Sequence, residues 1–269
     1  MIRKYFTSQY LTLSYLDNEQ EGKPVLICLH GLFGSARYFA GLMEQLTDWH
    51  VYSIDQRGHG WSGHASAGQY DREEFVEDIA AFIQQVLNNE PVIILGHSLG
   101  GFNAYQFASK YGHLVKGLII EEASAIEKED ASFAPHIIDH ALTLKELGDS
   151  LIQLGIQSAG YFLESAVETE AGWRFRFDKN HLDEVQMKLN GNWWDDFLHS
   201  SCPALLVHGK LSWVISQEHI EEMAAKRKNT KYVVFDQSSH AVLMDEPQKY
   251  IDTVKSFLDE LISATEAGN

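Results

Sequence analysis

The most informative stretch of this chain runs from Val92 to Gly101 and reads VIILGHSLGG. Its first four residues are apolar and β-branched enough to predict a buried strand. The following residues, Phe102 to Tyr111, are compatible with a helix. A G-x-S-x-G pattern in a turn between strand and helix predicts that Ser98 is a nucleophile. The alternative, a surface serine in a glycine-rich turn, is disfavoured by this context.

The glycines around Ser98 have a physical reason. A nucleophile raised on a tight turn needs a strained backbone, and neighbours without Cβ let the strand and the helix approach closely. The hydroxyl then lies near a helix N-terminus. There the amide of Leu99 can donate to a developing oxyanion.

Further apolar runs alternate with amphipathic stretches along the chain. Helical spacing from Asp71 to Leu87 and from Pro247 to Ile262 indicates helices, and an antiparallel strand is expected around Tyr10 to Tyr15. This alternation predicts an α/β fold with a mostly parallel sheet flanked by helices. The expected strands are Val25 to Leu29, Val51 to Ile54, Val92 to Leu95, Leu118 to Ile120, Ala204 to Val207 and Tyr232 to Phe235.

The alternation stops between Ala125 and Ser200, where helix-like segments follow one another over more residues than a crossover requires. We interpret residues 125–200 as an inserted helical cap, and residues 1–124 and 201–269 as the core. A cap at this place would cover the carboxyl ends of the strands, where ligands bind in open α/β sheets. The alternative is a helical elaboration without ligand contact.

Two further strand ends carry candidate residues. The expected strand from Val25 to Leu29 leads into HGLFGS, residues 30–35, a loop that can supply a second oxyanion donor. The amide of Leu32 is the first choice and that of Phe33 the second. His240 follows the last expected strand, at a place suited to the general base that takes the Ser98 proton.

Four motifs in this order resemble the α/β-hydrolase superfamily of esterases, lactonases, carbon-carbon bond hydrolases and dehalogenases. They are HGLFGS (30–35), DQRGHGWS (55–62), GHSLGG (96–101) and SSHAVLMDEP (238–247), and the likeness runs from Lys23 to Leu261. The resemblance implies the α/β-hydrolase fold and a serine hydrolase. Dehalogenases and epoxide hydrolases of the family use aspartate at the nucleophile position, so Ser98 disfavours both activities.

Serine hydrolases of this family use a triad of serine, histidine and a carboxylate that orients the histidine. The position of this carboxylate departs from the commoner family pattern. After the strand Ala204 to Val207 the family usually has G-x-x-D, but this chain has Ser212 at the aspartate position. Some members of the superfamily place the acid after the preceding strand, where this chain has Glu122. We therefore predict that Glu122 orients His240. The alternatives are Glu121, Asp245 and Asp236.

Aromatic and basic side chains outside the motifs are candidates for substrate contacts. Phe33, Trp193 and Trp213 could line an apolar pocket, although aromatic residues are also ordinary core residues. Arg174 and Arg176 alternate with aromatic residues and could hold a substrate carboxylate, but a solvated strand edge explains them equally.

Neither a metal nor an organic cofactor is expected. His136 and His140 are spaced to share one helical face, but no third ligand is assigned, so we interpret both as surface residues. The P-loop pattern G-x-x-x-x-G-K-[ST] is absent from the sequence, so nucleotide binding is not expected.

The charge of the chain restricts its partners. There are 21 basic and 38 acidic residues and a formal net charge of −17, which opposes binding to nucleic acid or anionic membranes. The start of the chain has no visible secretory signal, and no apolar run is long enough to span a membrane. Cys28 and Cys202 are read as isolated thiols, so a cytoplasmic location is expected. The sequence gives no indication of an oligomeric state.

The predicted reaction is hydrolysis of a small carboxylic ester, thioester or lactone through an acyl-enzyme on Ser98. A hydrolase that cleaves carbon-carbon or amide bonds with the same triad is the enzymatic alternative. A ligand-binding receptor is the non-enzymatic one, since a fold does not fix a function.

Overall fold

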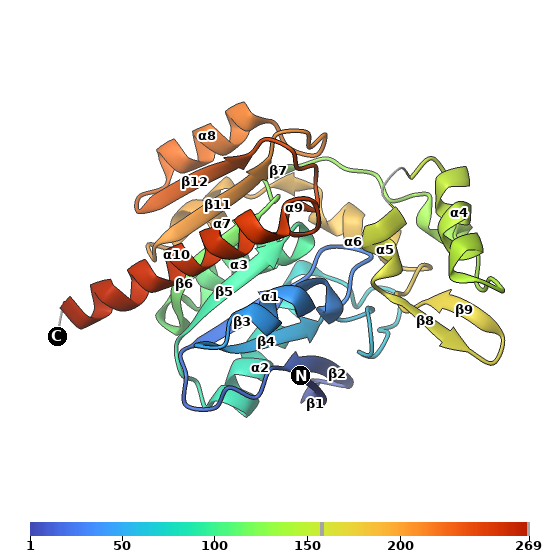
Figure 1. The fold of residues 1–269 in the computed structure, drawn as a ribbon, viewed down its shortest axis with the longest axis horizontal. Helices are drawn as coiled ribbons and strands as arrows, with labels where there is room; N and C mark the ends of the chain where they lie inside the picture. The colour runs from blue at the N-terminus through green and yellow to red at the C-terminus, as the bar shows by residue number, and fades with distance from the viewer. Residues whose placement is uncertain (157–158, 268–269) are drawn as a thin grey trace.

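Eight strands form one sheet in a computed structural model that describes residues 1–156 and 159–267. Their order is β1-β2-β4-β3-β5-β6-β11-β12, and neighbouring strands from β4 to β12 pair in parallel. The hairpin of β1 and β2 adds two strands at one edge, with β2 antiparallel to β4. The predicted α/β fold is therefore confirmed (Figure 1). The strands are β1 (Ile2–Ser8), β2 (Leu11–Asp17), β3 (Val25–Leu29), β4 (His50–Asp55), β5 (Val92–His97), β6 (Val115–Glu121), β11 (Ala204–Gly209) and β12 (Thr230–Phe235).

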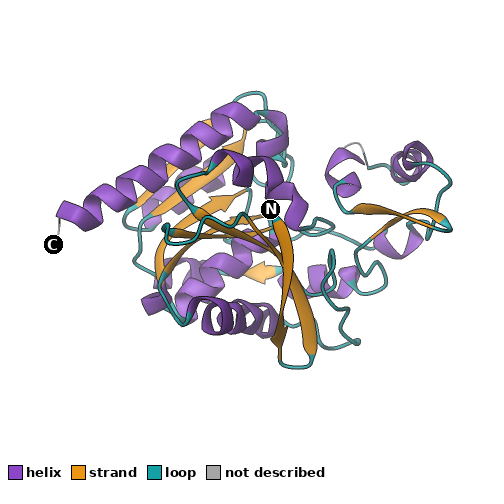
Figure 2. Ribbon diagram, turned by 60° about the horizontal axis from the view of Figure 1, so that its bottom comes forward, coloured by secondary structure: helices purple, strands orange, loops and turns teal. Residues whose placement is uncertain are grey.

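Helices cover both faces of this sheet, as Figure 2 shows. All six residues of β4, β5 and β11 are buried, which explains why these strands are rich in apolar residues. The longer helices bury one apolar side against the sheet and expose charged residues on the other. The helices of the core are α1 (Ala40–Gln45), α2 (Arg72–Leu87), α3 (Leu99–Lys110), α8 (Gln217–Lys226), α9 (Val242–Asp245) and α10 (Pro247–Ala267).

Residues 125–200 hold short elements, several of which form a smaller lobe at the end of the molecule opposite the tip of α10 (Figure 1). Two small antiparallel sheets, β7 with β10 and β8 with β9, are present where only helices were expected. The last helix packs on α3 of the core, with the rings of Phe197 and Tyr105 5.7 Å apart. The boundaries of the cap stay a prediction. The elements are β7 (Ile126–Glu127), α4 (Leu144–Gln153), α5 (Ala159–Leu163), β8 (Ala166–Thr169), β9 (Gly172–Phe175), α6 (Leu182–Leu189), β10 (Gly191–Asn192) and α7 (Trp194–His199).

Candidate active site

Ser98 occupies the turn between β5 and α3. Its backbone has φ 50° and ψ −120°, a conformation that a residue with a Cβ adopts only when its surroundings impose it. The Ser98 amide donates to the carbonyl of Glu121 at 2.8 Å. A Cβ on Gly96 would collide with the backbone of Gly100, and one on Gly100 with the backbone of Leu29. The glycines thus let strand and helix meet at a half-buried serine.

Glu122 follows β6 directly, and its carboxylate is fully buried. Oε2 lies 3.2 Å from Nδ1 of His240 and accepts a hydrogen bond from the Ser212 hydroxyl. Oε1 accepts from the Gly209 amide at 2.7 Å and lies 2.7 Å from Nδ1 of His208. Burial opposes ionisation of Glu122, but these hydrogen bonds outweigh it and lower the pKa of Glu122 to about 2. Glu122 is therefore an ionised group that can orient His240 and stabilise its imidazolium form.

The other carboxylates considered from the sequence have different partners. Glu121 accepts hydrogen bonds from the hydroxyls of Tyr38 at 2.7 Å and Tyr250 at 2.9 Å. Burial raises the pKa of Glu121 to about 7, although these donors oppose the rise. Asp245 bonds to a neighbouring serine, and Asp236 pairs with a surface lysine. Glu122 is the member of this set that the structure brings to His240.

His97 links the turn at Ser98 to the loop that carries His240. Its Nε2 lies 2.8 Å from the carbonyl of His240 and donates to it. Burial, with the nearby His240, lowers the pKa of His97 to about 3, so the ring is neutral and Nδ1 keeps a free lone pair. Among the described residues, this Nδ1 has no hydrogen-bond partner, and the buried hydroxyl of Tyr161 lies close to the backbone of Gly31. A Cβ on Gly31 would lie 2.7 Å from the first atom and 2.8 Å from the second, so both face the loop after β3.

The two predicted oxyanion donors lie at the ends of β3 and β5. Leu99 is the first residue of α3, where a backbone amide has no acceptor within its own helix. Leu32 lies in a turn closed by a 3.1 Å hydrogen bond from the Gly34 amide to the Gly31 carbonyl. In the same turn Phe33 has φ 66°, a left-handed value. Their role as oxyanion donors stays a proposal.

A cavity of about 610 Å³ is lined by both Ser98 and His240. Much of its wall is aromatic: Phe33 stacks on Phe162 with ring centroids 4.7 Å apart and lies 5.2 Å from Phe133. A volume of this size accommodates a small organic molecule. An apolar group beside the serine would pack against these rings.

Comparisons with known proteins agree with this geometry. The family described as alpha/beta hydrolase fold matches residues 24–144. The chain is also 28% identical to the sn-1-specific diacylglycerol lipase ABHD11 of Mus musculus, over 92% of this chain and 85% of that protein. Both matches support an α/β-hydrolase superfamily hydrolase.

Solved structures of other α/β-hydrolases superpose on most of the chain. A structure of E-2-(acetamidomethylene)succinate hydrolase has a TM-score of 0.85 and 22% identity, over 96% of this chain and 99% of the other. A marine microorganism esterase has a TM-score of 0.76 and 27% identity, over 91% and 98%. This chain is accordingly a hydrolase.

Two of the three predicted pocket residues of this hydrolase line the cavity, and one does not. Phe33 and Trp213 line the cavity, but the prediction for Trp193 was wrong. Trp193 does not line the cavity, and its half-buried indole donates its N–H to the Leu189 carbonyl of α6 at 2.7 Å. Arg174 and Arg176 do not line the cavity either, and each donates to a backbone carbonyl.

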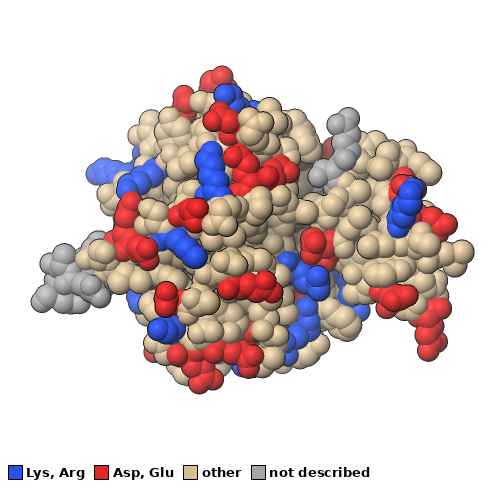
Figure 3. Space-filling model, viewed as in Figure 1, with Lys and Arg blue, Asp and Glu red and all other residues tan. Residues whose placement is uncertain are grey.

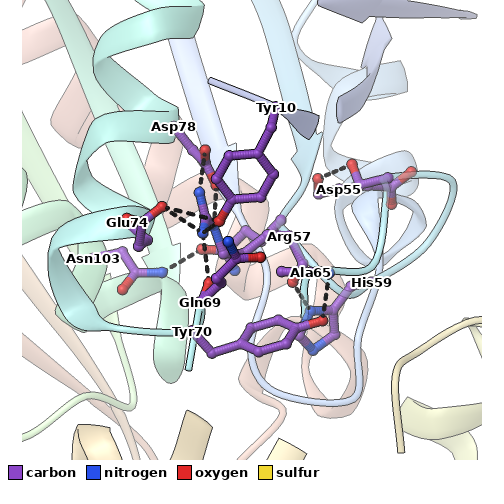
Figure 4. A network of polar contacts seen from close by, with 12 residues as sticks. Tyr10, Asp55, Arg57, His59, Ala65, Gln69, Tyr70, Glu74, Asp78 and Asn103 are labelled. Atoms are coloured by element: carbon purple, nitrogen blue, oxygen red, sulfur yellow. Dashed lines mark hydrogen bonds and ion pairs between the residues drawn. The ribbon is translucent and has the colours of Figure 1, made fainter. Parts of the chain in front are cut away.

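The motif at residues 55–62 is bonded both to helix α2 and to the loop after β3, next to the site. The buried guanidinium of Arg57 binds both carboxylate oxygens of Asp78, at 2.7 and 2.8 Å, and Glu74 at 2.8 Å (Figure 4). Asp78 and Glu74 lie on α2, so this network fixes the motif to that helix. The Gln56 amide of the motif also donates to Nε2 of His30, the first residue of the predicted oxyanion loop, at 3.1 Å.

Sequence reasoning missed two residues of the site. His208 contacts Glu122 because β11 pairs with β6 and sets Val207 opposite Glu121, which brings the next residue of each strand together. The expected order of parallel strands was a signal for this contact. Tyr161 lies on the five-residue helix α5, which is too short to have a recognisable period.

The structure bears on metals and membranes only within residues 1–156 and 159–267. No group of three or more His, Cys, Asp or Glu side chains there could hold a metal ion, and His136 and His140 are both exposed. Within the same ranges, no helix has the length and hydropathy needed to span a membrane.

Proposed function

We propose that this hydrolase cleaves a small carboxylic ester, thioester or lactone through an acyl-enzyme on Ser98. In this scheme His240 takes the proton of the serine hydroxyl as it attacks the carbonyl carbon, and returns it to the leaving group. The amides of Leu32 and Leu99 donate to the oxyanion of the tetrahedral intermediate. Water, activated by His240, then releases the acid and regenerates the serine. The scheme uses no metal or organic cofactor.

The observation that carries this proposal is the contact between Glu122 and His240. A buried, ionised carboxylate lies 3.2 Å from Nδ1 of the histidine, and the histidine lines the same cavity as Ser98. A carboxylate bound at Nδ1 fixes the tautomer in which Nε2 can accept a proton. A receptor that only binds its ligand has no need of this arrangement, so the contact favours turnover.

Cleavage of amides or carbon-carbon bonds is the second candidate. The structural relative with the TM-score of 0.85 is named for a substrate that is both an amide and a succinate. Among the described residues, no Lys or Arg lines the cavity of this chain to pair with such carboxylates. The relatives named lipase and esterase support the ester proposal instead.

The test compares p-nitrophenyl esters of increasing acyl length, and the matching p-nitroanilides, with wild-type protein and Ser98→Ala. We expect ester hydrolysis by the wild type, slower cleavage of the anilides, and a loss of roughly a thousandfold or more in kcat for Ser98→Ala. Absence of ester hydrolysis by folded wild type, or equal rates in Ser98→Ala, would refute the proposal.

A further inference from the structure

The cavity beside Ser98 has a one-sided charge. Among the described residues that line it, three carry carboxylates, Glu127, Glu129 and Asp130, and none is Lys or Arg. Glu127 lies on β7 and is only 5% exposed. This asymmetry bears on which substrates can enter.

Glu127 has only neutral hydrogen-bond donors. Its carboxylate accepts from the Gln186 amide at 3.2 Å and the Ser124 hydroxyl at 3.4 Å. Burial, and next the charge of Glu129, raise the pKa of Glu127 to about 7. Glu129 itself is half-buried at the cavity wall. Among the described residues that line the cavity, no Lys or Arg offsets these carboxylates, and His240 is the basic group whose charge acts on Glu127.

The surface beyond the cavity also carries a net negative charge. Acidic side chains are scattered over both lobes on the face shown in Figure 3, with basic ones interspersed. The chain has a formal net charge of −17, so the approach of an anionic substrate is opposed from long range as well.

A second feature of the same cavity points to an uncharged ligand. His97 and Tyr161 both line the cavity, and Nδ1 of His97 is buried without a hydrogen-bond partner among the described residues. Because Nε2 of His97 donates to the His240 carbonyl, Nδ1 can only accept. An O–H or N–H group can bind this lone pair, whereas a carboxylate oxygen is repelled by it.

We propose that this cavity selects esters whose acyl group is uncharged and rejects those that carry a carboxylate, with Glu127 and Glu129 as the residues that determine this selectivity. The inference rests on the proposed ester hydrolysis at Ser98. An uncharged acyl chain packs on the aromatic wall of Phe33 and Phe162 without leaving a charge unpaired. A carboxylate at the far end of the same chain meets the charge of Glu129 and that of the ionised fraction of Glu127 in a partly desolvated space.

The experiment uses two substrates with one leaving group and acyl chains of equal length, p-nitrophenyl valerate and mono-p-nitrophenyl glutarate. We expect kcat/KM of the wild type to favour the valerate by roughly tenfold or more. In Glu127→Gln/Glu129→Gln this preference should fall by about the same factor. The matched control is Glu44→Gln/Glu90→Gln, which removes the same charge from two exposed positions that do not line the cavity. Its preference should equal that of the wild type.

The outcomes separate the two proposals. Equal kcat/KM for both esters in the wild type, or an unchanged preference in Glu127→Gln/Glu129→Gln, would overturn the selectivity and leave ester hydrolysis in place. Turnover of neither ester would refute the proposed function itself. If the double variant does not fold, Glu129→Gln alone gives the same test, because its half-buried position tolerates the change better, and the preference should fall in the same direction.

Discussion

The carboxylate of Glu122 lies 3.2 Å from Nδ1 of His240, although 118 positions separate the two residues in the chain. Glu122 follows β6 and His240 follows β12, and β11 lies between these two strands in the sheet. Since the three strands are parallel, their carboxyl ends meet at one edge. Ser212, which follows β11, donates to Glu122 from the place where the family usually has its acid.

Replacing Glu122 by Gln should lower kcat by roughly a thousandfold or more and change KM little. The amide keeps the shape of the side chain but cannot stabilise the imidazolium of His240. Steady-state hydrolysis of a p-nitrophenyl ester measures this, with circular dichroism to verify the fold. Glu121→Gln is the matched comparison and should retain most of the activity. Near-normal kcat in Glu122→Gln with a collapse in Glu121→Gln would assign the acid to Glu121.

Moving the acid to the neighbouring strand end should rescue that variant in part. In Glu122→Gln/Ser212→Asp the new carboxylate occupies the position that the family commonly uses, and we expect kcat to recover by about tenfold relative to Glu122→Gln. Ser212→Asp alone should lose activity, because two carboxylates would then face each other. A folded double variant without any recovery would argue against the role given to these positions.

Glu121 should make the stability of the fold depend on pH. Its pKa of about 7 in the folded chain is above the ordinary 4.5. Between these values the folded chain holds a proton that the unfolded chain has lost, so the free energy of unfolding falls as pH rises through this window. The loss amounts to about 3 kcal/mol. Urea unfolding of wild type and Glu121→Gln across this range should give a smaller decrease for the variant. Parallel curves would show that Glu121 is not the titrating group.

The buried ion pair between Arg57 of the motif at residues 55–62 and Asp78 of α2 should stabilise the fold. Arg57→Met leaves the buried carboxylate of Asp78 unpaired, so we expect a loss of roughly 3–5 kcal/mol in the free energy of unfolding. Arg57→Met/Asp78→Leu should recover most of it, because neither charge is then buried. Removing the exposed pair of Lys231 and Glu260 should cost less than about 1 kcal/mol. Urea unfolding measures all three, and equal losses would contradict the buried network.

The sequence predicted the sheet well because both faces of its central strands are covered. The strand expected from Val25 to Leu29 has these bounds in the structure, and the expected helix from Asp71 to Leu87 is α2 with Asp71 as its N-cap. The edge strand β1 was missed because it mixes exposed and buried residues. Residues 125–200 were read only coarsely, since elements of two to ten residues are too short to show a reliable period.

The site was predictable to a similar degree. Motif order pointed to Ser98 and His240, but two adjacent glutamates at one strand end were equivalent in the sequence. Only the packing of β11 against β6 distinguishes them, by surrounding Glu122 with donors from the next strand end. Trp193 was misassigned because an aromatic residue fits a pocket and a core equally well until its neighbours are known.

The most direct test of the account is intact-protein mass spectrometry after treatment with a fluorophosphonate, followed by peptide mapping, on wild type and Ser98→Ala. We predict a single phosphonylated adduct on Ser98 in the wild type and none in Ser98→Ala, since only a serine activated by His240 reacts at neutral pH. Folded wild type without an adduct, or an adduct that persists in Ser98→Ala, would contradict Ser98 as the nucleophile.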